Sequence, residues 1–237
     1  MRLPFLPRVA SLVAAITLSS SADEPARWNV TAECQMVVLS QKAALALLPD
    51  LNNEAKIDAA FAKIQAMIGK GDAQLAANLL AKSLDGNKAT AESAEEMKYP
   101  TEWNPPQLPD QAQIPKEKII EVLKAWPLTG ATPTAFETRN VGAMIESSTA
   151  IAGDGKWLDV EITPQHVRFL RWNNYEIGML PNGRHIGIDQ PHFHTLKNTA
   201  SVRLRNGQRV LLGVHKLPPP EAAFELFLLR VSAKKVE

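Results

Sequence analysis

The second half of the chain is divided by glycine-containing turn signals, and these constrain the fold more than any other feature of the sequence. Asn-Gly and related pairs favour the tight turns that join antiparallel strands. The signals are Gly153-Asp154-Gly155, Pro181-Asn182-Gly183 and Asn206-Gly207. They predict hairpins with arms at residues 141–152 and 156–163, 175–180 and 184–188, and 199–205 and 208–214, and a final strand over 223–231. Such a series predicts an antiparallel sheet or partial barrel.

One arm of the first hairpin alternates clearly between apolar and polar residues. The alternating sets are Leu158, Val160 and Ile162 on one side, and Trp157, Asp159 and Glu161 on the other. Successive side chains of a strand point to opposite faces, so the apolar set is expected to be buried and Trp157 to point outward. An outward tryptophan either marks a partner interface or packs beneath another segment, and both interpretations stay open.

The first half of the chain carries helical patterns as well as strands. Its expected elements are a strand over 28–39, a helix over 41–48 ended by Pro49, a helix over 54–68 capped by Asn52 or Asn53 and ended by Gly69 and Gly71, a segment over 73–84 that fits a helix or a strand, and a strand over 88–98 after the Asp85-Gly86 turn. The expected fold class is therefore α+β, with the N-terminal helices packed on the antiparallel sheet.

Residues 99–133 are interrupted by prolines, which lack the backbone donor that a regular strand needs. We expect no regular strand to run through this segment and only one short helix, over 116–126, with Pro115 at its start. The segment is interpreted as an excursion that covers an edge or mouth of the sheet. The predicted organisation is a small N-terminal β-α-α segment over 28–71 and a larger core domain over 72–235 that contains the excursion.

Residues 1–22 have the pattern of a secretory signal peptide. Arg2 and Arg8 precede or flank an apolar run over 9–18, and small residues lead to an expected cleavage site after Ala22. An uncleaved anchor is the alternative. Export to the periplasm or outer membrane is expected, and loss of the two arginines would change the formal net charge from +1 to near −1. Such a chain has no strong field to attract nucleic acid.

The sequence after the signal peptide restricts how the chain can contact a membrane and whether it has a reactive thiol. No later stretch is apolar enough for a transmembrane helix, so any membrane contact would be made by strands, by a surface or through a partner. Cys34 is the one cysteine. It lies in an apolar stretch and is expected to be a buried side chain rather than a reactive thiol.

Several segments, in order, resemble motifs of the bacterial secretins of type II and type III secretion and of type IV pili. Phe136, Glu137, Arg139, Val141 and Gly142 match an F-E-x-R-x-V-G stretch; Gln190, Pro191, Phe193 and Thr195 match a Q-P-x-F-x-T element; and Gly207, Gln208 and Gly213 match a D-G-Q-T-V-x-x-G-G strand, with Val214 at the second glycine. Leu84 to Ala89 and Lys98 to Thr101 resemble two earlier signatures of the family.

This resemblance covers roughly residues 71–214 and implies a secretin core domain. It further implies a non-enzymatic cell-envelope protein that is a structural or accessory component of a secretion or pilus-type apparatus. The implied partners are protein subunits of an envelope complex, including copies of the chain itself, and no cofactor is implied. The chain is expected to be a short, divergent member that lacks the family's usual C-terminal part.

Two clusters of residues suggest further functions. His192 and His194 would lie on one face of a strand, about 7 Å apart along it, which suits two ligands of a divalent metal. A third ligand, such as His185 or Asp189, is not fixed by the sequence, so the metal-dependent enzyme that this pair suggests is an alternative. No nucleophile elbow, phosphate loop or dinucleotide fingerprint supports another enzyme class.

Arg203, Arg205 and Arg209 are predicted to lie around one hairpin tip, with Arg209 reaching the others across the turn. Together with Trp157 they form a candidate partner surface for acidic groups. The competing interpretation is a solvated face that protects a strand edge. A soluble periplasmic binding module with the same fold is a further alternative, and an apolar pocket beneath residues 116–126 would favour it.

Overall fold

The computed structural model describes residues 27–105, 113–125, 131–179 and 185–236 of the 237-residue chain, and it builds them into two antiparallel sheets and three α-helices. The expected signal peptide over 1–22 and the Pro181-Asn182-Gly183 turn lie outside the described residues. The fold class predicted from the sequence, α+β with antiparallel hairpins, is confirmed.

Sheet A contains four strands in the order β2–β1–β9–β8. Their bounds are Ala73–Leu84 for β2, Trp28–Ser40 for β1, Ala223–Lys235 for β9 and Arg209–Lys216 for β8. The segment over 73–84, which the sequence left open, is thus a strand. The first and last strands of the described chain are hydrogen-bonded neighbours, with Trp28 opposite Lys235.

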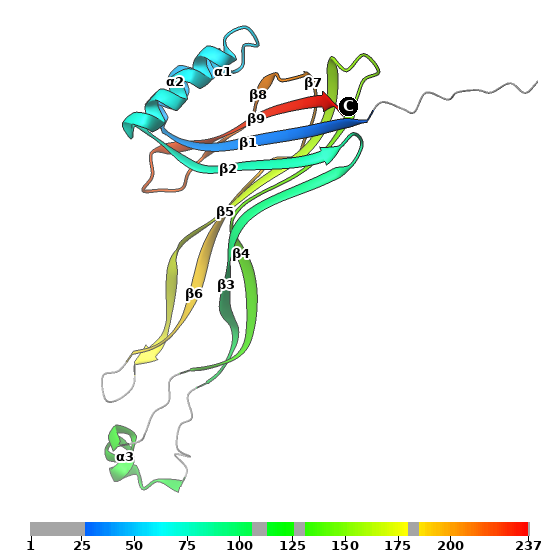
Figure 1. Ribbon diagram of the computed structural model, residues 1–237. Helices are drawn as coiled ribbons and strands as arrows, with labels where there is room; N and C mark the ends of the chain where they lie inside the picture. Colours follow the sequence, from blue (N-terminus) through cyan, green and yellow to red (C-terminus); the bar gives the residue numbers. More distant parts are fainter. Residues whose placement is uncertain (1–26, 106–112, 126–130, 180–184, 237) are drawn as a thin grey trace, which may run out of the picture.

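Sheet B has the order β3–β4–β5–β6, with β7 paired to the upper part of β5. Its strands are β3 (Lys88–Asn104), β4 (Thr132–Ile151), β5 (Trp157–Met179), β6 (His185–Lys197) and β7 (Ala200–Arg205). Its upper part packs on sheet A, and its lower part continues alone as a shaft (Figure 1). We call sheet A, the upper part of sheet B and the helices α1 and α2 the head.

The core of the head has two layers. On one side of sheet A, the helices α1 (Gln41–Leu51) and α2 (Ile57–Lys70) cover a cluster that contains Val37, Leu39 and Leu226. On its other side, β1 and β9 pack on sheet B through residues such as Val231 and Leu158. Burial of these apolar faces from water is the main force that holds the layers together.

The helices differ in detail from the prediction. α1 continues through Pro49 to Leu51, because a proline in the last turn removes only one internal hydrogen bond and Leu51 is anchored in the core. α2 begins at Ile57, not at residue 54, because Asn53 instead accepts a hydrogen bond from the backbone of Ala55 within the preceding turn. Its predicted end is confirmed at Gly71, which adopts φ of 81°.

The strands extend further into the Pro-rich segment than the sequence predicts, at both of its ends. β3 runs through Pro100 to Asn104, and β4 already begins at Thr132 with Pro133 as its second residue. Pro100 is tolerated because β3 is an edge strand and its register with β4 shifts between Pro100 and Glu102. In the described part, the segment contains a 3-10 turn over Lys116–Lys118 followed by α3 (Ile119–Ala125), close to the helix expected over 116–126.

The prediction of a hairpin around Asn206-Gly207 is wrong. The turn is present, but its arms do not pair with each other, because β7 pairs with β5 in sheet B and β8 pairs with β9 in sheet A. Asn206 joins this crossing to sheet A: its side chain donates to the carbonyl of Ala233 and accepts from the amide of Ala233, both at 2.8 Å. The turn therefore transfers the chain from one sheet to the other.

The shaft consists of two ribbons. The hydrogen-bonded register of β4 with β5 ends at Gly142 opposite Val167, and below this point β3–β4 and β5–β6 continue as separate pairs (Figure 1). Aromatic residues connect the ribbons, since the rings of Tyr99 on β3 and Phe193 on β6 lie 5.7 Å apart. The described helix α3 lies beyond the lower end of β3 and β4.

Candidate interaction surfaces

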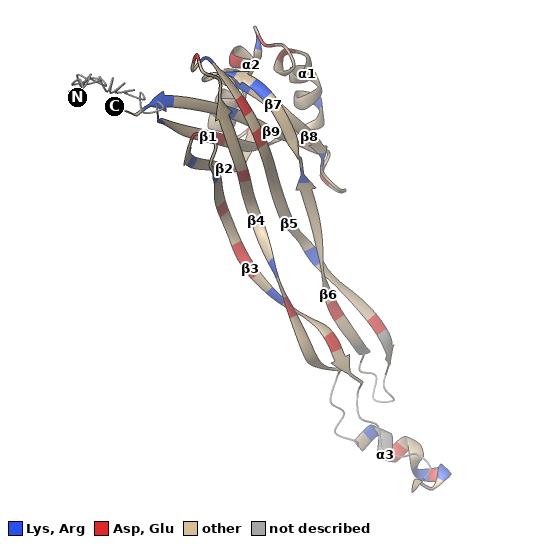
Figure 2. Ribbon diagram, turned by 90° about the vertical axis from the view of Figure 1, so that its right-hand side faces the viewer, with Lys and Arg blue, Asp and Glu red and all other residues tan. Residues whose placement is uncertain are grey.

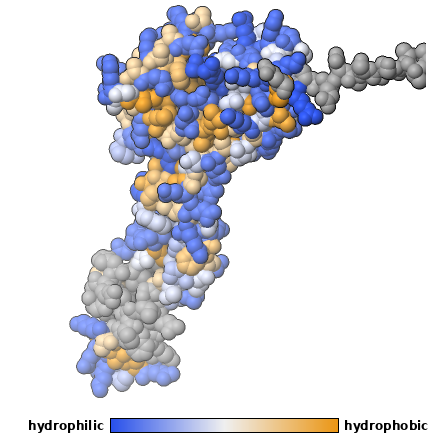
Figure 3. Space-filling view, in the orientation of Figure 1, coloured by the Kyte–Doolittle hydropathy of each residue, from blue (hydrophilic) through white to orange (hydrophobic). Residues whose placement is uncertain are grey.

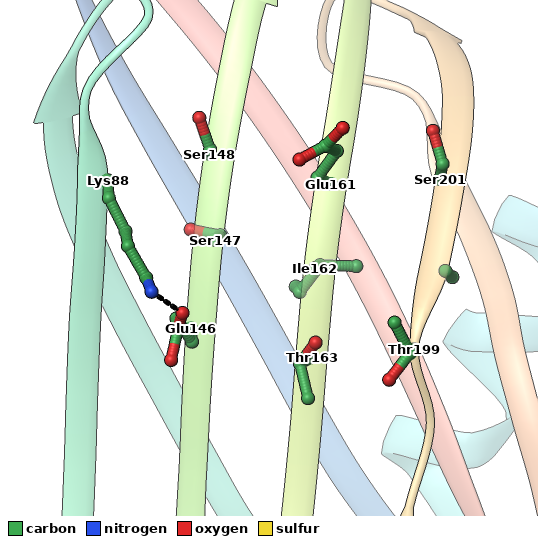
Figure 4. Close-up of a pocket in the computed structure, with 10 residues that line it drawn as sticks. Lys88, Glu146, Ser147, Ser148, Glu161, Ile162, Thr163, Thr199 and Ser201 are labelled. Atoms are coloured by element: carbon green, nitrogen blue, oxygen red, sulfur yellow. Dashed lines mark ion pairs between the residues drawn. The ribbon is translucent and has the colours of Figure 1, made fainter.

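The outer face of the upper part of sheet B, which points away from sheet A, is polar. It holds an open groove of about 510 Å³ lined by residues of β3, β4, β5 and β7 (Figure 4). Lys88 and Glu146 form an ion pair across two strands, and Glu161 lies beside them with the hydroxyl groups of Ser148 and Ser201. This arrangement follows from the predicted alternation, because Val160 and Ile162 occupy the buried face.

Trp157, Arg203 and Arg205, three of the predicted partner-surface residues, lie together on this outer face. Arg205 is opposite Trp157 in the strand register, and its guanidinium carbon lies 5.5 Å from the indole ring centroid. Arg203 binds Asp159 with two hydrogen bonds of 2.7 and 2.8 Å, and these lower the pKa of the Asp159 carboxyl group. Trp157 is 38% exposed in the head, so it does not pack beneath the described part of the Pro-rich segment.

Arg209 does not join the other two arginines, which corrects the predicted cluster. It begins β8 in sheet A, beyond the crossing turn, and donates to Asp58 of α2 at 2.7 Å. Its guanidinium also lies 4.1 Å from the ring centroid of Phe61. Arg209 therefore ties the edge of sheet A to the helical layer.

The first motif segment lies on β4 in the shaft. Phe136 is half exposed, and the ammonium of Lys98 lies 5.0 Å from its ring centroid. Glu137 accepts a hydrogen bond from the Tyr99 hydroxyl at 3.2 Å. The pKa of this hydroxyl is raised, by desolvation first and then by Glu137. Val141 follows, opposite Glu95 of β3.

Arg139 and Gly142 of the same motif have clear structural roles. The guanidinium of Arg139 donates to the hydroxyl of Thr195 at 2.8 Å and lies 4.9 Å from the ring centroid of Phe193, so it joins the two ribbons of the shaft. Gly142 has φ of 141°, and a Cβ atom there would lie only 2.3 Å from the backbone oxygen of Ser93. Arg139 thus meets the second motif segment on β6, which begins with Gln190 opposite Asn173.

The third motif segment is divided by the crossing turn. Gly207 has φ of 84° in this turn, and the side chain of Gln208 accepts from the amide of Arg205. Gly213 lies on β8 where its register with β9 shifts. A side chain at Gly213 would collide with Asn198 and His215.

Pro191 of the second motif segment lies opposite Trp172 in the shaft.

His192 and His194 both lie on β6 but have different surroundings. His192 is exposed and its Nδ1 lies 3.3 Å from the amide nitrogen of Asn173, whereas Nδ1 of His194 is buried. Asp189 accepts from Asn174 at 2.8 Å. Among the residues that the structure describes, no group of three His, Cys, Asp or Glu side chains is placed to hold a metal ion. Cys34 is fully buried, and burial raises the pKa of its thiol to about 12.

The strand edges were not anticipated from the sequence. Within the described residues, sheet A ends at β2 and β8, and sheet B ends at β3 on one side and at β6 and β7 on the other. β3 carries four glutamates and two lysines, whereas β6 and β7 carry Arg203, Arg205 and Lys197 with one aspartate (Figure 2). The two edges of sheet B therefore differ in charge. The charged residues of these strands are visible in the sequence. The positions of the strands in the sheet, however, depend on pairing with segments that are far away along the chain.

Two observations bear on membranes and ligands. Among the described residues, no helix has the length and apolar character needed to cross a bilayer. A second open groove, of about 730 Å³, lies at the lower end of the shaft and is lined by polar and apolar residues of β3, β4 and β6, among them Trp103, Thr134 and Ile188. The space-filling view shows apolar side chains distributed over the head and shaft among polar ones (Figure 3).

Comparison with solved structures finds chains of bacterial secretins. The InvG secretin domain of the Salmonella SPI-1 injectisome has a TM-score of 0.35 and 10% identity, with 90% of this chain and 62% of that chain covered. The type II secretion system secretin GspD of E. coli K12 has a TM-score of 0.37 and 13% identity, with 90% and 51% covered. The V. cholerae type IV competence pilus secretin PilQ has a TM-score of 0.33 and 11% identity, with 91% and 62% covered.

This chain thus spans about half to two thirds of the length of these three secretin chains. The sequence matches no protein-family model and no curated protein.

Proposed function

We propose that this chain is a non-enzymatic structural or accessory subunit of an exported cell-envelope assembly, of the secretion or pilus type, and that it associates side by side with other subunits through its open strand edges. The motifs that resemble secretins support the type of assembly, and the pattern of residues 1–22 supports export. The partners proposed are other protein subunits, including copies of the chain itself.

The observation that carries the proposal is the open edge of sheet B. β3 is 17 residues long and β4 is its only paired strand in the described structure, and β6 and β7 form the opposite edge. An edge strand presents unpaired backbone donors and acceptors to which a strand of another chain adds readily. Long edges on both sides therefore suit a subunit that continues its sheet into its neighbours.

The charges of these edges favour a particular mode of association. The acidic edge on β3 includes Glu92, Glu95 and Glu96, and the basic edge on β6 and β7 includes Lys197 and Arg205. An edge pairs poorly with its own copy when both carry the same charge, whereas the acidic edge of one copy attracts the basic edge of the next. Head-to-tail contacts of this kind close into a ring when the rotation between subunits permits it.

The lower part of the shaft is the part that we propose to contact membrane. Trp172, Tyr175 and Met179 of β5 are 46%, 54% and 64% exposed, and Phe136 of β4 is 50% exposed. Aromatic side chains of this kind are favoured where an apolar phase meets water. The proposed localisation is therefore the periplasm, in association with the outer membrane.

Oligomeric state tests the proposal directly. The full chain, with its own N-terminal segment, is expressed in a bacterium with an outer membrane, and the periplasmic and membrane fractions are separated. We expect the protein in the membrane fraction, with its N-terminus generated after Ala22, and as a ring in detergent extracts seen by light scattering and electron microscopy. A chain that is monomeric and freely soluble in the periplasm, and that captures no envelope subunit after cross-linking, would contradict it.

A further inference from the structure

Buried and partly buried ionisable side chains gather where the end of the β8–β9 hairpin of sheet A meets β5 and β6 of sheet B. Nδ1 of His166 on β5 lies 2.6 Å from Oε1 of Glu225 on β9, and Glu225 is fully buried. His215 on β8 is opposite Glu225 in the strand register. The fourth member, His194 on β6, is opposite Arg168, which is two residues beyond His166. These four residues are the buried cluster.

Three atoms of the buried cluster have no hydrogen-bond partner among the described residues. They are Nδ1 of His194, Nε2 of His215 and Oε2 of Glu225, and each is shielded from solvent. Buried polar atoms are normally paired, and an unpaired one costs free energy. The cluster is therefore a position where the fold holds poorly satisfied ionisable groups.

The charged side chains around the cluster are already engaged with partners. The charged groups that face it are Arg168 of β5, Glu225 of β9 and Glu221 of the turn before β9, which accepts from Arg168 at 3.0 and 3.2 Å. One guanidinium thus faces two carboxylates. Because Arg168 and Glu221 bind each other, and Glu225 already lies against His166, a proton on His215 adds a positive charge with no free carboxylate beside it among the described residues.

His215 is the residue at which an added proton is most disruptive. Its ring is half-buried, packs 4.7 Å from the ring centroid of Phe227 and lies close to Gly213, where an added Cβ atom would be 3.1 Å from Nε2 of His215. The pKa of His215 is lowered, by desolvation first and also by His194, although Glu225 acts in the opposite direction. Its imidazolium form is therefore unfavourable in the closed arrangement.

We propose that the buried cluster of His166, His194, His215 and Glu225 is an acid-sensitive joint, which holds the β8–β9 end of sheet A against β5 and β6 while His215 is neutral and loosens this contact when His215 takes up a proton. The direction of the pH effect follows from the link between proton binding and the stability of the closed state. A histidine that is harder to protonate in the closed state stabilises it above its ordinary pKa of about 6.5, and this contribution is lost as the pH falls below that value.

Hydrogen–deuterium exchange tests the joint whether or not the chain assembles. Exchange is measured at pH 7.5 and at pH 5.5, with correction for the intrinsic effect of pH. In the unmodified protein, we expect peptides that cover β8 and residues 217–227 to lose protection at pH 5.5, while peptides of α2 keep theirs. Unchanged protection of β8 and β9, or an equal loss in all peptides, would overturn the joint.

Variants assign the effect to His215. His215→Phe keeps the packing on Phe227 but cannot be protonated, and His215→Gln is the second variant if the first does not fold. Both are expected to show no loss of protection between the two pH values. His192→Gln, at an exposed histidine of β6, is the matched control and is expected to lose protection as the unmodified protein does. A His215→Gln protein that responds to pH like the unmodified one would overturn the assignment.

Discussion

At the residue scale, Gly142 is the position where the backbone most restricts substitution. Its φ of 141° disfavours any side chain, and an added Cβ would meet the backbone of Ser93 and Ala94 on β3 at 2.3 to 2.6 Å. We expect Gly142→Ala to lower the free energy of unfolding by about 1 to 3 kcal/mol or more. Gly69→Ala, in α2 where nothing lies within 4 Å, should instead raise it by about 0.5 to 1 kcal/mol. Urea unfolding of both variants measures this, and equal effects would contradict it.

Cys34 allows a second prediction at this scale. Its side chain is fully buried and its thiol pKa is raised to about 12, so almost no thiolate is present at pH 8 and no reagent reaches the sulfur. We expect no reaction with a chromogenic disulfide reagent over an hour in the folded protein and complete reaction in guanidinium chloride. Rapid labelling of the folded protein would show that this part of the core opens readily.

At the element scale, the sequence predicted most strands but not their partners. Alternation is local, so Leu158, Val160 and Ile162 were assigned correctly to the buried face. Pairing depends on distant segments: Asn206-Gly207 is a correct turn, yet its arms pair with β5 and β9. Because of this, the predicted grouping of Arg209 with Arg203 failed. The positions of the acidic edge, the basic edge and the buried cluster depend on the same distant pairing, which no local pattern indicates.

The crossing turn itself gives a prediction for an element. The side chain of Asn206 makes two hydrogen bonds of 2.8 Å to the backbone of Ala233 on β9, and so holds the passage from sheet B to sheet A in place. We expect Asn206→Ala to lower the free energy of unfolding by about 1 to 2 kcal/mol. Asn78→Ala, at an exposed position of β2, should change it by less than about 0.5 kcal/mol. Similar losses in the two variants, measured by urea unfolding, would refute a special role for Asn206.

At the scale of the whole molecule, the charges of the two edges of sheet B decide how copies can meet. Glu95→Lys with Glu96→Lys reverses the exposed charges in the middle of β3, and we expect this double variant to assemble weakly because two basic edges then repel. Glu117→Lys with Glu121→Lys, at the described end of the Pro-rich segment, makes the same change in net charge and should leave assembly intact. Light scattering of detergent extracts measures both.

A mixing experiment tests the direction of the contact as well as its charge. Lys197→Glu with Arg205→Glu makes the basic edge acidic, so this variant alone should also assemble weakly. Mixed in equal amounts with the variant reversed on β3, it places an acidic edge beside a basic one at every contact, because the two variants alternate around a head-to-tail ring. Assembly should then return, and should weaken again as salt is raised, since exposed charges are screened. Assembly that stays low in the mixture would mean that these two edges do not face each other between subunits.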